Sequence, residues 1–196
     1  MGSYTDEELM GLVQKQDVSA FEELFRRYEQ RVFVFLWRLS ANRQAAEDGT
    51  QETFLRLWKA RVRYEPTGRF STYLFQIAKN HFLHERQKQD RRAEPDRTSA
   101  QNPTEATGEP APWEEADGPV LARELQVAVS QAMARLPDAL RLTYVLTEQE
   151  GMSYKQAAEV LDCPVGTVSS RKVEAVRRLR ELLKPLRDEL LGDEER

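Results

Sequence analysis

The sequence has one cysteine, two histidines and no long apolar run. Cys163 has no partner for a disulfide bond within these 196 residues, which fits a reducing compartment. The longest apolar runs, such as residues 32–37, are far shorter than the roughly 20 residues that cross a membrane. The first nine residues carry three acidic side chains and no apolar stretch. We therefore expect no secretory signal, no membrane span and a cytoplasmic location.

The sequence shows no clustered set of catalytic or metal-binding groups. The two histidines, His81 and His84, have no cysteine and no further histidine at ligand spacing. The carboxylates Asp48 and Glu52 share one predicted helix and have no partners on a facing element. We therefore expect no metal site, no cofactor and no enzymatic activity.

The formal net charge of −4 conceals an uneven distribution. Residues 1–92 carry a net charge of +3, residues 93–119 carry −6 and residues 120–196 carry −1. The acidic middle holds five of the nine prolines and has no apolar period, which is typical of a disordered linker. Clustered basic residues at the two ends keep nucleic acid as a candidate partner despite the acidic total.

Hydrophobic periodicity predicts helices on both sides of the linker, so the expected fold class is all-α with two small helical domains. Capping boxes at Thr5–Glu8 and Ser19–Glu22 predict the first two helix starts. Further helices are predicted near residues 43–61, 71–90, 120–135, 138–149, 153–161 and 165–190. The expected boundaries are 1–92 for the first domain, 93–121 for the linker and 122–192 for the second domain.

The helix predicted at 43–61 has a second stripe opposite its core-facing side. This outer stripe consists of Asp48, Gln51, Glu52, Leu55 and Trp58. Carboxylates around exposed apolar side chains are typical of a surface that docks another protein. Packing of the leucine and the tryptophan inside the domain is an equally good interpretation.

Aromatic and basic side chains alternate between residues 64 and 92. Aromatic rings stack on unpaired bases and cations neutralise the backbone, so this pattern suggests single-stranded DNA binding. The candidate residues are Tyr64, Arg69, Phe70, Ser71, Tyr73, Gln76, Lys79, Asn80, Leu83 and Arg86. An aromatic core beneath a solvated surface is the alternative.

The segment from Tyr154 to Lys172 has the pattern of a helix-turn-helix. Ala158 is small where two helices must cross closely, and Asp162–Pro164 predicts the turn. The start of the second helix would face a DNA major groove, and later arginines would contact phosphates. The candidate residues are Thr167, Ser169, Ser170, Arg171, Lys172, Glu174, Arg177 and Arg178. An ordinary helical hairpin with a basic face is the alternative.

Together these motifs resemble the extracytoplasmic-function group of the sigma-70 family of bacterial transcription initiation factors. Residues 46–58 are similar to the group's core-binding helix, and residues 68–81 to its promoter-opening segment. Residues 136–141, 151–154 and 164–171 are similar to its region-4 helix-turn-helix.

The resemblance implies a sigma factor that binds core RNA polymerase and directs promoter-specific initiation. The first domain (region 2) would bind the clamp of the large subunit and capture unpaired bases of the −10 element. Asn80 and its neighbours would read the upstream edge of that element, and the loop at 64–71 would hold a flipped base. The second domain (region 4) would read double-stranded DNA at the −35 element, with the polymerase flap as a further contact. An anti-sigma factor is another implied partner.

A dimeric helix-turn-helix regulator is the alternative function. Such a regulator needs a ligand pocket or a phosphoacceptor in its first domain, and the sequence shows neither pattern. A nucleic-acid-processing enzyme is the weakest interpretation, because the carboxylates lack partners.

Four residues, at three places in the chain, depart from the group's pattern. Gln76 and Ile77 stand where housekeeping members have two tryptophans. Gly49 replaces an apolar residue in the core-binding helix, at a propensity cost of about 1 kcal/mol against alanine. Glu174 stands where a basic residue is usual. Its carboxylate would either accept a hydrogen bond from a cytosine or pair with Arg178, four residues on.

Overall fold

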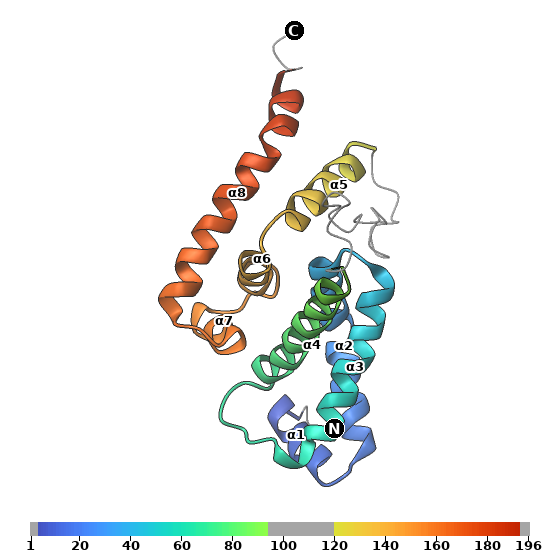
Figure 1. Cartoon of the computed structure of the whole chain (residues 1–196). Helices are drawn as coiled ribbons and strands as arrows, with labels where there is room; N and C mark the ends of the chain where they lie inside the picture. The colour runs from blue at the N-terminus through green and yellow to red at the C-terminus, as the bar shows by residue number, and fades with distance from the viewer. Residues whose placement is uncertain (1–3, 94–119, 193–196) are drawn as a thin grey trace.

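The computed structural model describes residues 4–93 and 120–192, which form helices and no strand (Figure 1). The first group of helices comprises α1 (Asp6–Gln14), α2 (Val18–Ser40), α3 (Arg43–Ala60), the 3-10 turn η1 (Arg61–Arg63) and α4 (Phe70–Ala93). The second group comprises α5 (Val120–Ala134), α6 (Asp138–Tyr144), the π-helical turn η3 (Val145–Gln149), α7 (Tyr154–Leu161) and α8 (Val165–Gly192). The prediction of an all-α fold in two parts is confirmed. The predicted linker lies almost wholly outside the described residues. Among the described residues, no helix is long and apolar enough to span a membrane.

The starts of α1 and α2 show one correct and one wrong capping prediction. The Thr5 hydroxyl accepts a hydrogen bond from the Glu8 amide (3.2 Å), and the Glu8 carboxylate accepts one from the Thr5 amide (2.7 Å). The box predicted at Ser19 does not form, because α2 begins earlier, with Asp17 as its N-cap. The Asp17 carboxylate accepts a hydrogen bond from the Ala20 amide at 3.0 Å. Aspartate and serine are about equally good N-caps, so the local pattern did not decide between them.

Helix α2 supplies most of the core of the first group. Its apolar stripe packs against α1, α3 and α4, and Leu24, Val32 and Phe35 are fully buried. The Phe35 ring meets the Phe75 ring of α4 edge-on, with 5.1 Å between centroids. This packing fixes α3 and α4, the two helices that carry the candidate sites of the first group.

Gly49 of α3 lies at the crossing of three helices. A Cβ atom added there would lie 3.0 Å from Leu36 Cδ1 of α2 and 3.1 Å from His81 Cδ2 of α4. The glycine therefore weakens the intrinsic helix propensity of α3 but lets the neighbouring helices approach closely. The close approach of Leu36 and His81 is a structural reason for a glycine at this position.

Helices α7 and α8 form the predicted helix-turn-helix. The Ser153 hydroxyl accepts a hydrogen bond from the backbone amide of Gln156, and the side-chain oxygen of Gln156 accepts one from the backbone amide of Ser153. Helix α7 ends at Asp162, which adopts a left-handed conformation with φ 51°. Ala158 is buried where α7 and α8 pack together, as predicted, and Val168 of α8 is buried as well. The first turn of α8 therefore projects from a rigid corner.

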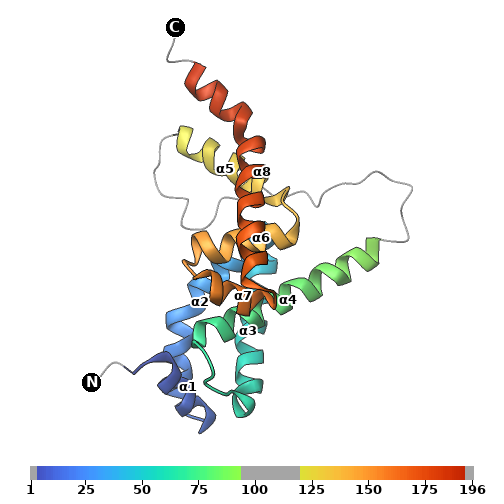
Figure 2. The same cartoon turned by 90° about the vertical axis from the view of Figure 1, so that its left-hand side faces the viewer.

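The two groups of helices pack against each other. Figure 1 shows α4 lying between α2 and α3 on one side and α6 and α7 on the other, and in Figure 2, which looks from the side of α7 and α8, α7 lies beside α4. The most extensive contact between the two groups is that of α4 with α7. The buried apolar side chains of both groups form one continuous core. Part of the α4 surface that the sequence placed toward solvent is therefore covered.

Candidate functional site

The outer stripe of α3 faces solvent as predicted. Asp48, Gln51 and Leu55 are exposed, and Leu55 keeps 52 % of its surface. Glu52 is half-buried and pairs with Arg56 at 2.7 Å, and this hydrogen bond lowers the pKa of the Glu52 carboxyl. An exposed leucine flanked by carboxylates has the character of an anchor for a partner with a basic rim.

Trp58, at the end of the same stripe, is half-buried rather than exposed. Its ring meets the Phe21 ring edge-on at 5.1 Å, and the Arg61 guanidinium lies 4.3 Å from its centroid. The alternative interpretation, packing inside the domain, therefore applies to Trp58, whereas Leu55 faces solvent. The tryptophan holds α2, α3 and η1 together while leaving part of its ring at the surface.

The loop at 64–71 is held from behind by aromatic packing. Tyr64 and Phe70 are buried, and the Tyr64 ring lies 5.1 Å from that of Tyr73. Helix α4 begins where the Phe70 amide donates to the Glu7 carboxylate of α1 at 2.9 Å. Burial raises the pKa of both tyrosine hydroxyls. Arg69 remains exposed, so this loop presents a cation on a firmly supported backbone.

The predicted DNA-binding face of α4 is only partly open. Asn80 is exposed, whereas Lys79 keeps only 7 % of its surface. Burial lowers the pKa of Lys79, although the nearby Asp162 of the α7–α8 turn acts in the opposite direction. The Arg86 Nε atom lies 3.6 Å from the Asp138 carboxylate at the start of α6. The remaining members of the face, which are half-buried, are Ser71, Gln76 and Leu83.

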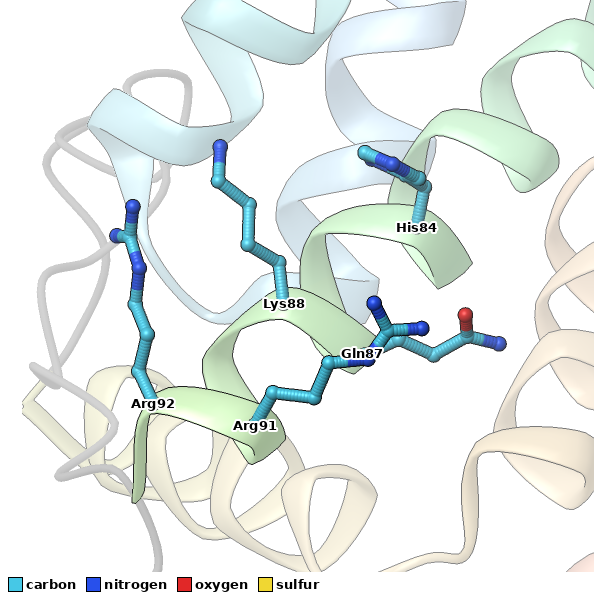
Figure 3. A pocket seen from close by; sticks show the side chains of 5 residues that line it. All are labelled: His84, Gln87, Lys88, Arg91 and Arg92. Atoms are coloured by element: carbon cyan, nitrogen blue, oxygen red, sulfur yellow. The ribbon is translucent and has the colours of Figure 1, made fainter. Parts of the chain in front are cut away.

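The last turns of α4 carry a basic groove that was not among the predicted site residues. Figure 3 shows its side chains, with Lys88 and Arg92 pointing the same way from the helix. The groove has a volume of about 220 Å³ and is lined by His84, Gln87, Lys88, Arg91 and Arg92. The i, i+3 and i+4 spacing of these cations is the sequence signal that could have identified the groove. It extends the basic surface of α4 beyond Arg86.

The first turns of α8 present a mixed face. Ser170 is exposed, and its hydroxyl donates to the Thr167 carbonyl at 3.1 Å. Arg171 is half-buried, with its guanidinium 3.8 Å from the Cys163 sulfur. Lys172 turns back toward η3, where it pairs with Glu148 at 2.5 Å. The other predicted residues of this face, both half-buried, are Thr167 and Ser169.

Glu174 is fully engaged by two arginines of its own helix. Arg177 donates to both of its carboxylate oxygens (2.8 and 2.7 Å), and Arg178 donates to one of them at 2.7 Å. These hydrogen bonds lower the pKa of Glu174 to about 2. The sequence left open whether Glu174 contacts a base or pairs with Arg178. In the structure Glu174 pairs with Arg178, and Arg177 adds a second pair.

The two histidines of α4 have different surroundings, since His84 is exposed and His81 is half-buried. No group of three or more potential ligands comes together within residues 4–93 and 120–192. His81 instead packs against Gly49, and burial lowers its pKa.

Comparison with family models identifies both halves of the chain. Residues 24–92 match the model described as Sigma-70 region 2, and residues 126–179 match the model described as Sigma-70, region 4. The first match includes the α3 stripe and nearly all of α4, and the second includes the helix-turn-helix.

Individual relatives agree with the family models. The RNA polymerase sigma-H factor of Pseudomonas aeruginosa is 32 % identical over 187 residues, covering 92 % of this chain and 95 % of that protein. The ECF RNA polymerase sigma-E factor of Haemophilus influenzae is 32 % identical over 185 residues, covering 93 % of this chain and 97 % of that protein. Among solved structures, the sigma factor RpoE in complex with the anti-sigma factor NepR from Bartonella quintana is similar, with 27 % identity and a TM-score of 0.67. That match covers 84 % of this chain and 96 % of the RpoE chain. The chain therefore belongs to the extracytoplasmic-function group of the sigma-70 family of RNA polymerase sigma factors.

Proposed function

We propose that this sigma factor divides its work among three surfaces: the outer stripe of α3, the loop and exposed face of α4, and the first turns of α8. In this proposal residues 1–92 form the domain that binds polymerase and the −10 element, and residues 122–192 form the domain that binds the −35 element. Residues 93–121 connect the two. The observation that carries the proposal is the exposed, acid-flanked Leu55, because a free-standing DNA-binding protein has no need of such an anchor.

The outer stripe of α3 supports docking on the clamp of the polymerase large subunit. Leu55 provides an apolar centre, and Asp48 and Glu52 provide acidic flanks that a basic surface would complement. A few anchors of this kind carry most of the energy of a protein interface, and truncating one typically costs about 2 kcal/mol or more.

The loop at 64–71 and α4 support capture of unpaired −10 bases. Tyr64, Phe70 and Tyr73 hold the loop backbone, while Arg69 and Asn80 reach solvent. Cations beside a rigid aromatic platform attract the phosphates and accept bases that have left the stack. The basic groove at the end of α4 would extend this surface toward the double-stranded DNA upstream.

The first turns of α8 support reading of the −35 element in a major groove. Gly166 lies in open space, so the backbone there could approach DNA closely. Thr167 and Ser170 lie one turn apart on that side, and Arg171 is placed beside them for a phosphate. Arg177 and Arg178 lie further along the same helix, where backbone contacts would follow.

The proposal implies partners and excludes catalysis by this chain. Core polymerase supplies the clamp, the flap and all the chemistry, so the sigma factor needs no catalytic residue or cofactor and acts in the cytoplasm, where transcription takes place. An anti-sigma factor is a further expected partner, since the similar RpoE chain is bound to one. The competing function, a dimeric regulator, would leave the stripe of α3 without a role.

Polymerase binding by variants of the stripe tests the proposal. Leu55→Asp and Asp48→Lys should each weaken binding to core polymerase by at least about ten-fold, as expected for an interface anchor. Val62→Asp is the matched control, because Val62 is an exposed apolar residue outside the stripe, with 73 % of its surface accessible. Normal binding by both stripe variants, with their folding intact, would contradict the assignment.

A further inference from the structure

Five consecutive residues of the loop at 64–71 are exposed, and the residues on either side of them are buried. Residues 65–69, which include Arg69, lie open to solvent, whereas Tyr64 and Phe70 keep 5 % and 0 % of their surface. A stretch of this kind loses backbone freedom when it binds, and that loss weakens binding unless the free protein already holds the stretch in place. The contacts at its two ends therefore determine how well the loop is prepared for a base.

Helix α1 makes a hydrogen bond to each end of this exposed stretch. At the start, the Gln14 side-chain amide donates to the Tyr64 carbonyl at 2.8 Å. At the end, the Glu7 carboxylate accepts from the Phe70 amide at 2.9 Å. That amide belongs to the first residue of α4, so no carbonyl of the same helix can accept from it, and a carboxylate is a favoured partner there. Because Glu7 and Gln14 lie about two turns apart on α1, one rigid helix sets the separation of both ends.

Helix α1 is itself fixed to the rest of the first group. The buried residues of its inner face are Leu9, Met10 and Val13. Its first residue, Asp6, accepts hydrogen bonds from the Arg27 guanidinium at 2.7 Å and from the Tyr28 hydroxyl, both on α2. The Tyr28 ring in turn meets the Phe70 ring edge-on, with 5.3 Å between centroids. The hydrogen bonds of Glu7 and Gln14 thus connect the loop to a fixed part of the domain.

We propose that Glu7 and Gln14 are positioning residues of the −10 loop: they hold its two ends on α1, so that residues 65–69 meet an unpaired base in one preformed arrangement. The inference rests on the proposed function, because that function gives the loop a base to bind. Neither residue needs to touch DNA. Without one of the two hydrogen bonds, only the fraction of molecules with a correctly placed loop binds the base, and the apparent affinity for that base falls accordingly.

Forked −10 DNA with and without the captured base separates positioning of the loop from general support of the fold. The fork carries a single-stranded −10 element, and an abasic site is placed at each of its positions in turn. For the wild-type holoenzyme, the abasic site should weaken binding most at the position whose base enters the loop. E7A and Q14A should each weaken binding of the intact fork by about five-fold, equivalent to about 1 kcal/mol for one hydrogen bond. Both variants should bind the fork that lacks this base as tightly as the wild type does.

Further variants of α1 complete the test. E7Q keeps a side-chain oxygen that can accept from the Phe70 amide, so it should bind the intact fork more tightly than E7A and nearly as tightly as the wild type. E8A is the matched control, because Glu8 accepts from the Thr5 amide in the cap of α1 itself, and its preference for the intact fork should equal that of the wild type. Gln14 is exposed, so Q14A keeps the test available if E7A impairs folding, which circular dichroism would show.

Equal losses on the intact and the abasic fork would mean that Glu7 and Gln14 only support the fold, and would overturn the proposal. Wild-type binding of both forks by E7A and Q14A, or a loss of the same kind in E8A, would overturn it as well. A wild-type holoenzyme that binds every abasic fork as tightly as the intact fork would instead refute capture of a base by the loop, which is the proposed function itself. The two failures are therefore distinct.

Discussion

Replacing Glu174 by glutamine is the sharpest test of how α8 binds the −35 element. The substitution keeps the shape of the side chain but removes the charge that holds Arg177 and Arg178. If the carboxylate serves only to hold these arginines, E174Q frees both of them for phosphates. The logarithm of the binding constant should then fall more steeply with the logarithm of salt concentration, by about 0.9 for each phosphate newly contacted. The preferred −35 sequence should not change.

The assay is promoter binding by holoenzyme, because the protein alone is expected to bind promoters weakly. Salt titrations at one promoter give the slope, and a randomised −35 library gives the preferred sequence. E181Q is the matched control: Glu181 contacts Arg177 at 2.5 Å, but Arg177 would remain held by Glu174. The slope should therefore stay at its wild-type value in E181Q.

A changed sequence preference would refute this reasoning. If Glu174 reads a cytosine, E174Q should lose about 1–3 kcal/mol of discrimination at one base pair. The pH dependence offers a second check. Because the pKa of Glu174 is lowered to about 2, its pairing stabilises the fold above the unfolded pKa near 4.5 and is lost only as the pH falls toward 2. The salt slope of the wild type should therefore not change through this group between about pH 5 and 8.

The remaining predictions concern the first domain. Trp58→Ala should lower the free energy of unfolding by about 2 kcal/mol, which is less than for a fully buried aromatic, and should also weaken polymerase binding. Leu55→Asp should weaken polymerase binding only, and urea titration separates the two effects. Gly49→Ala should destabilise the fold in the wild-type background, because the new Cβ meets Leu36 and His81. In a His81→Ala background the same change should destabilise the fold less, or stabilise it by up to the roughly 1 kcal/mol of helix propensity. Equal effects in both backgrounds would exclude the His81 clash. Burial, and after it the charge of Arg56, lower the pKa of His81 in the folded protein. The contribution of His81 to stability should therefore be complete above the unfolded pKa near 6.5 and decline as the pH falls. Thermal unfolding between about pH 5 and 8 should show a weaker pH dependence for His81→Gln than for the wild type.

Much of the site chemistry could be predicted because it depends on neighbours along one helix. Helical spacing placed Leu55 on the outer stripe and put Glu174 within reach of Arg178, although the sequence left open whether Leu55 packs inside the domain and whether Glu174 contacts a base. The predicted helices begin and end within a few residues of those observed, because periodicity and helix-breaking residues are local signals. The cap of α2 was wrong for a local reason as well: Asp17 and Ser19 both suit an N-cap, and the sequence did not rank them.

The features that could not be predicted depend on contacts across the fold. Trp58 meets Phe21 of α2, and Gly49 is required by His81, 32 positions later in the chain. The burial of Lys79 requires α7, which follows α4 only after the linker. Arg31 of α2 donates to the Glu150 carboxylate at 3.1 Å. Nothing in the sequence around either residue singled it out, since each is a common surface residue type in an amphipathic context.

The sequence by itself determined the all-α class, the two helical halves and the order of the three candidate surfaces, because hydrophobic period, charge and turn chemistry act over a few residues. Only the tertiary structure decided which parts of those surfaces are accessible. Accessibility depends on the partner that each helix face meets, and Arg31 finds its partner 119 positions away. A charged side chain is equally compatible with solvent and with a buried ion pair until the opposing group is in place. The covering of α4 by α6 and α7 is therefore a property of the packed molecule.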